Sequence, residues 1–566
     1  MTENSRTLSP VYQLASDYVD ALAALDPVTA TGAGIAGHET EMTDYSPDGY
    51  AAIAALRQQT RAQLEKAPVM SERDRIAADA MREHLDVRLA LFDAQEHLYL
   101  AGSIGSPAAG IRRVFDLMPR ATAEDFERIA KRLTLVPSAM NSFEASLSEG
   151  MRVHKTGAIR QAEEASRQAK AYSGQDADTP AFFATLVEAF DSSGIGDASL
   201  RRVLEQGAAS ATDAFAGFGR YIDERYMDGA TATDGVGRER YGLNARGYNG
   251  ITLDLDETYQ WGWDELYRIE DEMRKTCARI LPGASIDETK AYLEADPARA
   301  IDGVDEFRQW MQALQERTID ELDGVHFDIP GPVRVIEAMI APPGGAAAMY
   351  YTGPSEDFSR PGRTWYPTLG KTRFPLWGEV SIAYHEGVPG HHFQIATTKY
   401  LAEELSRFQR LMGGTSGYVE GWALYAERLM GELGYLENPD YYLGMLRAQA
   451  MRAVRVIVDI GMHLSLPIPK GEAFHGGETW DAQLGDIFAR QRAQFPEDFM
   501  KSEVTRYLGA PGQAISYKVG ERCWLEAREA ARHARGATFD LKAWHAAALN
   551  LGPMGLAQMQ RELAVA

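Results

Sequence analysis

Cysteine and long hydrophobic runs are both scarce in this sequence. Cys277 and Cys523 are the only two cysteines among 566 residues, too few for a disulfide framework, so we expect both thiols to be free. No apolar run approaches the roughly 20 residues that a membrane-spanning helix needs. Residues 1–7 lack the basic start and apolar stretch of a signal peptide, which predicts a cytoplasmic protein, or an exported one if a leader had been removed.

Basic residues are also fewer than acidic ones. The chain carries 58 basic and 81 acidic residues, a formal net charge of -23, whereas binding to nucleic acid requires a basic surface. The composition therefore argues against a nucleic-acid partner. It is compatible with small or cationic substrates, and it leaves the oligomeric state open.

Helical periodicity dominates the first half of the chain. Residues 9–22 begin with a serine that can cap a helix and a proline suited to its first turn, and Ser71 opens a second pattern that runs toward Phe92. The glycine-rich span 228–250 is the best linker candidate, and a further helical region follows over 256–323. We therefore predict a mainly α protein with an N-terminal helical lobe over 1–245 and a catalytic helical lobe over 246–566.

The pattern at His385 is typical of a zinc-peptidase motif that contains an insertion. In the usual form, His-Glu-x-x-His places two imidazoles on one helical face to hold Zn²⁺, the glutamate activates water, and a later carboxylate completes the site. Here His385 and Glu386 are followed by histidines only six and seven positions after His385, at His391 and His392. The later carboxylate is Glu420.

Helix geometry is incompatible with a straight helix through this insertion. At roughly 100° per residue His391 would point about 240° away from His385, and His392 would lie about 10 Å further along the axis. Nitrogen ligands lie only about 2.1 Å from zinc. Pro389, followed by Gly390, is expected to kink or bulge the helix.

Shortening the insertion by two residues restores the usual spacing between His385 and His391. This interpretation predicts His385, His391 and Glu420 as ligands of one Zn²⁺ per chain, with Glu386 as the general base. His392 remains open as the alternative second ligand, as a substrate contact or as a packed side chain.

The motif also resembles a known family. Residues 385–394 together with 420–423 look like the bacterial domain of unknown function 885 (DUF885), which is similar to gluzincin-type zinc metallopeptidases and distantly to the carboxypeptidase Taq family. Residues 451–463 and 506–520 carry further resemblance. The resemblance implies a two-lobed helical fold with a deep cleft, and a small sheet beside the metal-binding helix.

A polar stripe follows the motif at helical spacing. Arg452, Arg455, Asp459 and His463 share one face of an otherwise apolar helix. Such a stripe is expected to be buried, because polar groups in apolar surroundings require partners. Either it fastens helices together, or His463 faces the zinc as a catalytic group and an arginine binds a substrate carboxylate.

Other candidates follow from the resemblance. It implies a tyrosine that stabilises the oxyanion of the intermediate, and Tyr517 is the matching residue, with Lys518 beside it as a substrate contact. Strand-like segments over 333–339 and 346–352 would form the sheet, so that Tyr350 and Tyr351 border the substrate.

These observations together predict a zinc metallopeptidase-like hydrolase. The expected substrate is a short peptide, with a carboxypeptidase as one form of the activity. The alternatives are a zinc amidase for a non-peptide or modified amide and a metal-binding module without catalysis.

Overall fold

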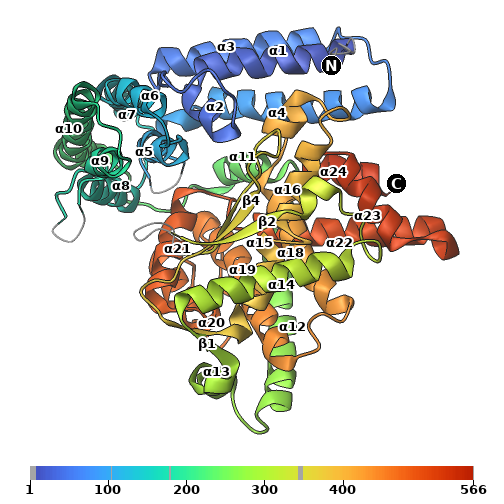
Figure 1. The fold of residues 1–566 in the computed structure, drawn as a ribbon. Helices are drawn as coiled ribbons and strands as arrows, with labels where there is room; N and C mark the ends of the chain where they lie inside the picture. The colour runs from blue at the N-terminus through green and yellow to red at the C-terminus, as the bar shows by residue number, and fades with distance from the viewer. Residues whose placement is uncertain (1–7, 103–104, 177–179, 342–347, 565–566) are drawn as a thin grey trace. The chain divides into compact units, whose positions relative to one another are not determined.

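The computed structural model describes residues 8–102, 105–176, 180–341 and 348–564. Helices make up most of these residues, and the strands among them are short (Figure 1). The predicted mainly α fold class is therefore confirmed. None of the helices among the described residues is both long and apolar enough to span a membrane.

The chain divides into two compact units. Unit 1 comprises Met1–Met70, Leu85–Val236 and Thr505–Ala510, and unit 2 comprises Ser71–His84, Gly237–Val504 and Pro511–Ala566. The predicted boundary at 245 lies inside a helix of unit 2. Residues 71–84 belong to unit 2 and residues 505–510 to unit 1, unlike the residues on either side of them, and no sequence pattern indicated this. Every predicted site residue belongs to unit 2.

Unit 1 is a set of helices around an aromatic core. Its first helix begins after Ser9, whose hydroxyl accepts a hydrogen bond from Tyr12 N (3.2 Å), as the capping pattern predicts. Phe143 and Phe215 belong to its core. The helices are α1 (Pro10–Leu25), α2 (Pro27–Ala33), α3 (Pro47–Leu64), α5 (Pro107–Leu117), α6 (Ala123–Leu133), α7 (Val136–Arg152), α8 (Ile159–Tyr172), α9 (Ala184–Ser192) and α10 (Ala198–Tyr221), while α4 (Glu72–Asp93) has residues in both units.

The predicted linker over 228–250 is only partly a linker. Residues Arg238–Asn249 form a helix, α11, between Gly237 and Gly250, which both have positive φ. Tyr241 and Ala245 of this helix are buried. Burial of that face outweighs the low helix propensity of its internal glycines.

Unit 2 contains the remaining helices. Two of them, α18 and α19, hold the long buried segments of the sequence motifs. The helices are α12 (Leu255–Ile280), α13 (Ile286–Ala295), α14 (Val304–Leu322), α15 (Val380–Glu386), α16 (His391–Tyr400), α17 (Arg407–Met412), α18 (Ser416–Glu432), α19 (Pro439–Leu464), α20 (Ala482–Arg492), α21 (Glu497–Gly509, which ends in unit 1), α22 (Ser516–Arg535), α23 (Leu541–Asn550) and α24 (Leu556–Leu563).

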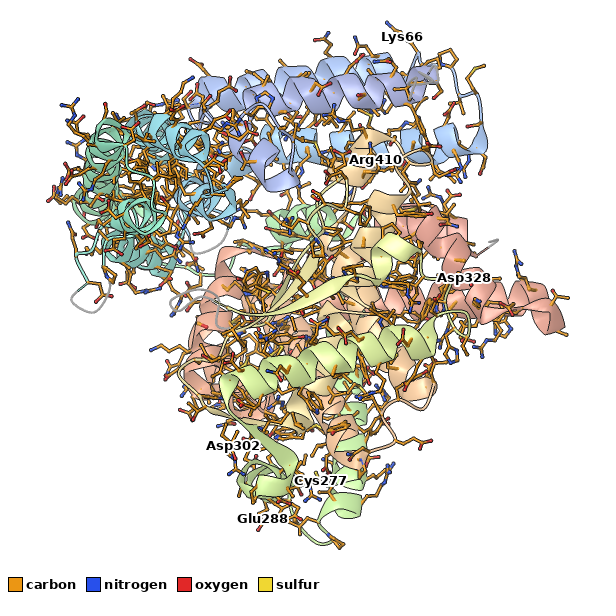
Figure 2. All side chains as sticks on the ribbon, in the orientation of Figure 1. Lys66, Cys277, Glu288, Asp302, Asp328 and Arg410 are labelled. Atoms are coloured by element: carbon orange, nitrogen blue, oxygen red, sulfur yellow. The ribbon has the colours of Figure 1, made fainter. Side chains whose placement is uncertain are left out.

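Both cysteines lie in unit 2. Cys277 is in α12, where Figure 2 labels it, and Cys523 is in α22. Each is a buried free thiol, as the low cysteine count predicts.

Two small sheets accompany the helices of unit 2. Strands β2 (Ile336–Ile340), β4 (Gly362–Tyr366) and β3 (Tyr350–Thr352) form one sheet in the order β2-β4-β3, with β2 parallel and β3 antiparallel to β4. Strands β1 (Ala300–Asp302) and β5 (Arg373–Pro375) pair antiparallel.

The strand predicted over 333–339 begins later than expected. Residues Gly331–Arg334 form a 3-10 turn, because Pro332 fixes the backbone there and cannot donate to a strand ladder. Of the second predicted run, residues 346 and 347 lie outside the described residues, and Tyr350–Thr352 is a strand.

Helices α18 and α22 approach each other closely through glycines. A Cβ added at Gly421 would lie 2.5 Å from Gly520 Cα, closer than real contacts allow. Gly421 follows Glu420 directly, and Gly520 lies three residues after Tyr517. The glycines therefore let these two candidate site helices pack against each other.

Replacing Gly421 by alanine should destabilise the fold. Overpacking of this kind costs about 1–3 kcal/mol, so we expect a lower melting temperature in thermal unfolding. Gly242→Ala in α11 is the matched control, since its added Cβ would meet nothing within 4 Å, and it should be neutral or stabilising by up to about 1 kcal/mol. Equal melting temperatures for Gly421→Ala and the wild type would disprove the tight contact.

Candidate metal centre

The predicted kink in the motif is a complete break between two helices. Helix α15 ends at Glu386 and α16 begins at His391. Gly390 N donates to Tyr384 O (3.0 Å), and a side chain at Gly390 would collide with the carbonyl of His385. Trp422 Nε1 donates to Pro389 O (2.8 Å) and fastens the break to α18.

The break brings the three predicted ligands together. One ligand atom from each of His385, His391 and Glu420 lies within 4.8 Å of the other two. Glu420 Oε2 is 3.5 Å from His385 Nε2 and 3.3 Å from His391 Nε2. Both imidazoles are buried, and the Glu420 side chain is 22% exposed.

A second carboxylate orients His385. Its Nδ1 donates to Glu427 Oε1 (2.8 Å), since a carboxylate can only accept, and Ser381 Oγ donates to Glu427 Oε2 (2.9 Å). With Nδ1 protonated, a neutral His385 presents its Nε2 lone pair to Glu420. Carboxylate–histidine pairs of this kind fix the tautomer of metal-ligating histidines.

The charges of the group support a cation at its centre. Burial lowers the pKa of His385, but Glu420 and Glu427 outweigh burial and raise it to about 9. Burial raises the pKa of Glu420, whereas His391 and His385 bring it well below its usual value. These shifts favour a positive charge among the three side chains, either a proton on an imidazole or a bound metal ion.

Buried atoms without partners make the same point. Glu420 Oε2 accepts no hydrogen bond from the described residues, although it is buried between two imidazoles. Two nitrogens and one oxygen around a common point therefore fit a divalent metal ion of the zinc type.

Glu386 lies next to these ligands in sequence and is 7% exposed. Burial raises the pKa of its carboxyl group, and His391 and His385 offset part of that effect. A carboxylate with a raised pKa is a stronger base, as general-base catalysis requires.

His392 packs away from the three-ligand group. It is fully buried, its Nε2 donates to Val333 O (2.7 Å), and its Nδ1 accepts from the Tyr351 hydroxyl (2.9 Å). Burial lowers its pKa to about 4. Both ring nitrogens are therefore committed to the protein, which leaves neither for a metal or a substrate.

The predicted polar stripe is buried along α19, but its members have separate partners. Arg455 pairs with Glu503 (2.6 Å), and Arg452 Nη2 lies 3.9 Å from Glu427 Oε1. Arg452 Nε is buried and has no hydrogen-bond partner among the described residues. Arg452 is thus the arginine of the stripe that borders the metal group.

The far end of the stripe fastens helices together. Asp459 Oδ2 accepts from the Tyr241 hydroxyl (2.8 Å) and from Gly512 N (3.1 Å), while its Oδ1 lies 3.5 Å from His463 Nε2. His463 is eleven residues beyond Arg452, roughly 16 Å along the helix axis. The expectation that His463 faces the metal is wrong, because helical rise carries it away.

Tyr517 lies beside the metal group. Its ring stacks near the imidazole of His385 at 6.5 Å between centroids. The guanidinium groups of Arg455 and Arg452 lie 4.5 and 5.7 Å from the Tyr517 ring centroid. The tyrosine predicted from the resemblance is therefore next to a predicted ligand.

Lys518 points into a buried ionic network. Its Nζ is 2.7 Å from Glu265 and 2.5 Å from Glu521, and it also donates to Gln449. These contacts use the three donors of the ammonium group. The predicted substrate contact is therefore wrong for Lys518, since the side chain is 1% exposed and fully paired.

Tyr350 and Tyr351 lie in β3, on the edge of the three-stranded sheet. Tyr350 stacks on Trp365 at 5.9 Å, and the Tyr351 hydroxyl is used by His392. The sheet thus contacts α16 through His392, one residue after the predicted ligand His391.

Glu427 and Ser381 were missed as site residues. Glu427 follows Glu420 by one heptad on the same helical face, a signal equally typical of a solvated carboxylate. Only its complete burial and its contact with His385 distinguish the two cases.

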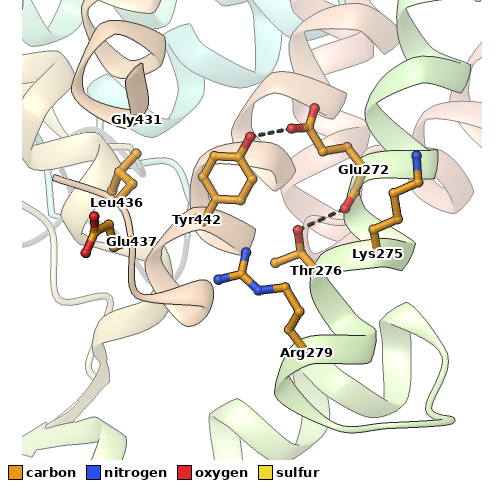
Figure 3. A pocket seen from close by; sticks show the side chains of 8 residues that line it. All are labelled: Glu272, Lys275, Thr276, Arg279, Gly431, Leu436, Glu437 and Tyr442. Carbon is orange, nitrogen blue, oxygen red and sulfur yellow. Dashed lines mark hydrogen bonds between the residues drawn. The ribbon is translucent and has the colours of Figure 1, made fainter. Parts of the chain in front are cut away.

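A pocket lies elsewhere in unit 2. This pocket has a volume of about 660 Å³. The Tyr442 hydroxyl donates to Glu272, and Thr276 Oγ1 donates to Glu272 O at 2.9 Å. Figure 3 shows both hydrogen bonds among the lining residues. Lys275 and Arg279 also line the pocket. None of the three predicted ligands does, so this pocket is separate from the candidate metal centre.

The fold and the site together define a mainly α protein with a buried His-His-Glu group capable of holding a metal. The chain belongs to the family described as bacterial protein of unknown function (DUF885), which it matches over residues 27–563. No curated protein matches it.

Two solved structures share the fold over nearly the whole chain. A candidate lipoprotein from Colwellia psychrerythraea is 22% identical with a TM-score of 0.83, covering 98% of this chain and 99% of that one. A candidate lipoprotein of unknown function from Shewanella oneidensis is 17% identical with a TM-score of 0.74 and the same coverage. At these identities the likeness shows the fold alone.

Removing a clustered ligand should remove the metal. We expect His385→Ala, His391→Ala and Glu420→Ala to lose bound divalent metal, because two remaining ligands hold it weakly, whereas His392→Ala should retain it. Elemental analysis of the purified variants measures this, with His475→Ala, an exposed histidine, as the control. Full occupancy in His391→Ala, or loss in His392→Ala alone, would reject the ligand set.

Proposed function

We propose that this protein is a zinc-dependent peptidase that hydrolyses peptide bonds in short peptides. The observation that carries the proposal is the convergence of His385, His391 and Glu420 beside the buried Glu386. Three such ligands with an open position are typical of catalytic zinc. When bound there, zinc would polarise the scissile carbonyl and make the attacking water more acidic.

Glu386 performs the proton transfers in this proposal. Its carboxylate accepts the proton of the attacking water and passes it to the nitrogen of the leaving amine. The burial that raises its pKa also excludes competing solvent and strengthens it as a base. His385 is kept in one tautomer by Glu427 throughout.

Tyr517 and Arg452 stabilise the negative charge that develops in the transition state. A hydroxyl donor near the reacting carbonyl stabilises the developing oxyanion, and Tyr517 is supported by its position against His385. Arg452 contributes positive charge from behind Glu427. Arg455 is less suited to substrate binding, because Glu503 already pairs with it.

The alternative is a zinc amidase acting on a non-peptide or modified amide, which would use the same groups. A peptide panel distinguishes the two. The solved relatives are described as candidate lipoproteins, which supports the exported alternative for the location of this chain.

The Glu386→Gln variant tests the mechanism. The amide has the shape of the carboxylate but cannot accept a proton, so turnover should fall by about 10²-fold to 10⁴-fold or more, while metal content and melting temperature stay unchanged. Hydrolysis of short peptides is followed by mass spectrometry, with and without a chelator and with zinc restored.

Glu403→Gln, an exposed change of the same kind, is the matched control and should be fully active. Near-normal hydrolysis by Glu386→Gln would exclude it as the base. Wild-type hydrolysis that survives complete removal of metal would exclude the zinc mechanism itself.

A further inference from the structure

An arginine outside the predicted set lies in an aromatic sandwich. The Cζ atom of Arg447, on α19, is 4.2 Å from the ring centroid of Trp377 and 4.5 Å from that of Phe495. The space on one side depends on Gly378, where an added Cβ would collide with the guanidinium. Stacking on two rings holds the planar group in a defined orientation.

This guanidinium has unused donors. Arg447 Nε is buried without a hydrogen-bond partner, and the described residues place no carboxylate within ion-pair distance of Arg447. The neighbouring Glu294 is occupied by Trp377 Nε1 (3.0 Å). The Arg447 side chain is half-buried, and a charge with reduced access to water and no direct partner is costly, so the arrangement suits an anion that arrives from outside.

Glu379 provides only partial compensation. Its charge acts on Arg447 without contacting it, and its Oε2 is buried and accepts no hydrogen bond from the described residues. Burial raises the pKa of Glu379 to about 7, with Arg447 and Lys371 offsetting part of the effect and Glu294 adding to it. An arriving carboxylate would therefore meet a weakly opposed cation.

The position of Arg447 relates it to the metal centre. It lies five residues before Arg452 on α19, about 7.5 Å along the axis, and Glu379 lies six residues before His385, about 9 Å if helical. Burial lowers the pKa of Arg447, Glu379 and Glu294 offset part of that effect, and Arg452 adds to it. Two or three residues of extended peptide, at about 3.3 Å each, cover an axial distance of this size.

We propose that Arg447 binds a free carboxylate of the substrate, through the paired N–H groups of a guanidinium held between Trp377 and Phe495. The substrate class is then peptides with a free C-terminal or acidic side-chain carboxylate near the scissile bond. This inference rests on the proposed peptidase function, whose substrate it specifies.

The experiment uses two tripeptides, acetyl-Ala-Ala-Phe as the free acid and as the C-terminal amide. Binding is measured by calorimetry in the Glu386→Gln background, where turnover does not interfere, and KM is measured in the wild-type background. Binding of the free acid should be at least tenfold tighter than that of the amide, and Arg447→Lys should remove most of that difference, because charge remains but the planar fork is lost.

A single neutral substitution of Arg447 would leave the Glu379 carboxylate without its opposite charge and could destabilise the fold. The double variant Arg447→Met/Glu379→Gln avoids this problem, because it removes both charges. It should bind both tripeptides equally and weakly. Arg274→Gln, an exposed arginine on α12 with its side chain 59% exposed, controls for net charge and should keep the preference. A third tripeptide, acetyl-Glu-Ala-Phe-amide, distinguishes a side-chain carboxylate from a terminal one.

The two proposals fail in different ways. If the wild type hydrolyses and binds peptides without preferring a free carboxylate, or if both Arg447 variants keep the preference, then Arg447 does not bind the substrate carboxylate. The proposed peptidase function would stand. If binding depends on the carboxylate and on Arg447 but the wild type hydrolyses no peptide, then the peptidase function is wrong. The carboxylate site at Arg447 would stand.

Discussion

The hydrogen bond from His385 Nδ1 to Glu427 is the interaction on which the candidate site depends. Because it commits Nδ1 as a donor, it turns the Nε2 lone pair of a neutral His385 toward Glu420 and His391. A buried group of electron-pair donors is unfavourable unless a proton or a metal ion lies among them. One hydrogen bond between α15 and α18 thus orients a buried histidine as a candidate ligand.

Helix α18 organises this arrangement along its length. Glu420 is the third predicted ligand, Gly421 admits α22 at close distance, Trp422 fastens the helix break through Pro389 O, and Glu427 orients His385. These roles need different side chains at fixed helical positions. The motif around Glu420 is therefore a structural unit as much as a ligand.

The grouping of His385, His391 and Glu420 could be predicted from the sequence, because helix geometry alone limits how the two histidines can approach each other. The separation of His385 from His391 is incompatible with a helix, and Pro389 with Gly390 offers a way to interrupt it. The early helices were predictable for similarly local reasons, as the Ser9 cap shows.

Long-range placement was beyond sequence reasoning. Lys518 and His463 share segments with Tyr517 and Arg452, yet Lys518 meets Glu265 and Glu521, while helical rise takes His463 to Asp459. Arg447 had no motif at all, since its character comes from rings that are distant in sequence.

Anomalous diffraction at the zinc edge would show whether His385, His391 and Glu420 hold a metal ion. For crystals of the wild-type protein grown with zinc, we expect one strong peak per chain, about 2.0–2.2 Å from a nitrogen of His385, a nitrogen of His391 and an oxygen of Glu420. A peak coordinated by other residues, or no peak at these three side chains, would contradict this prediction.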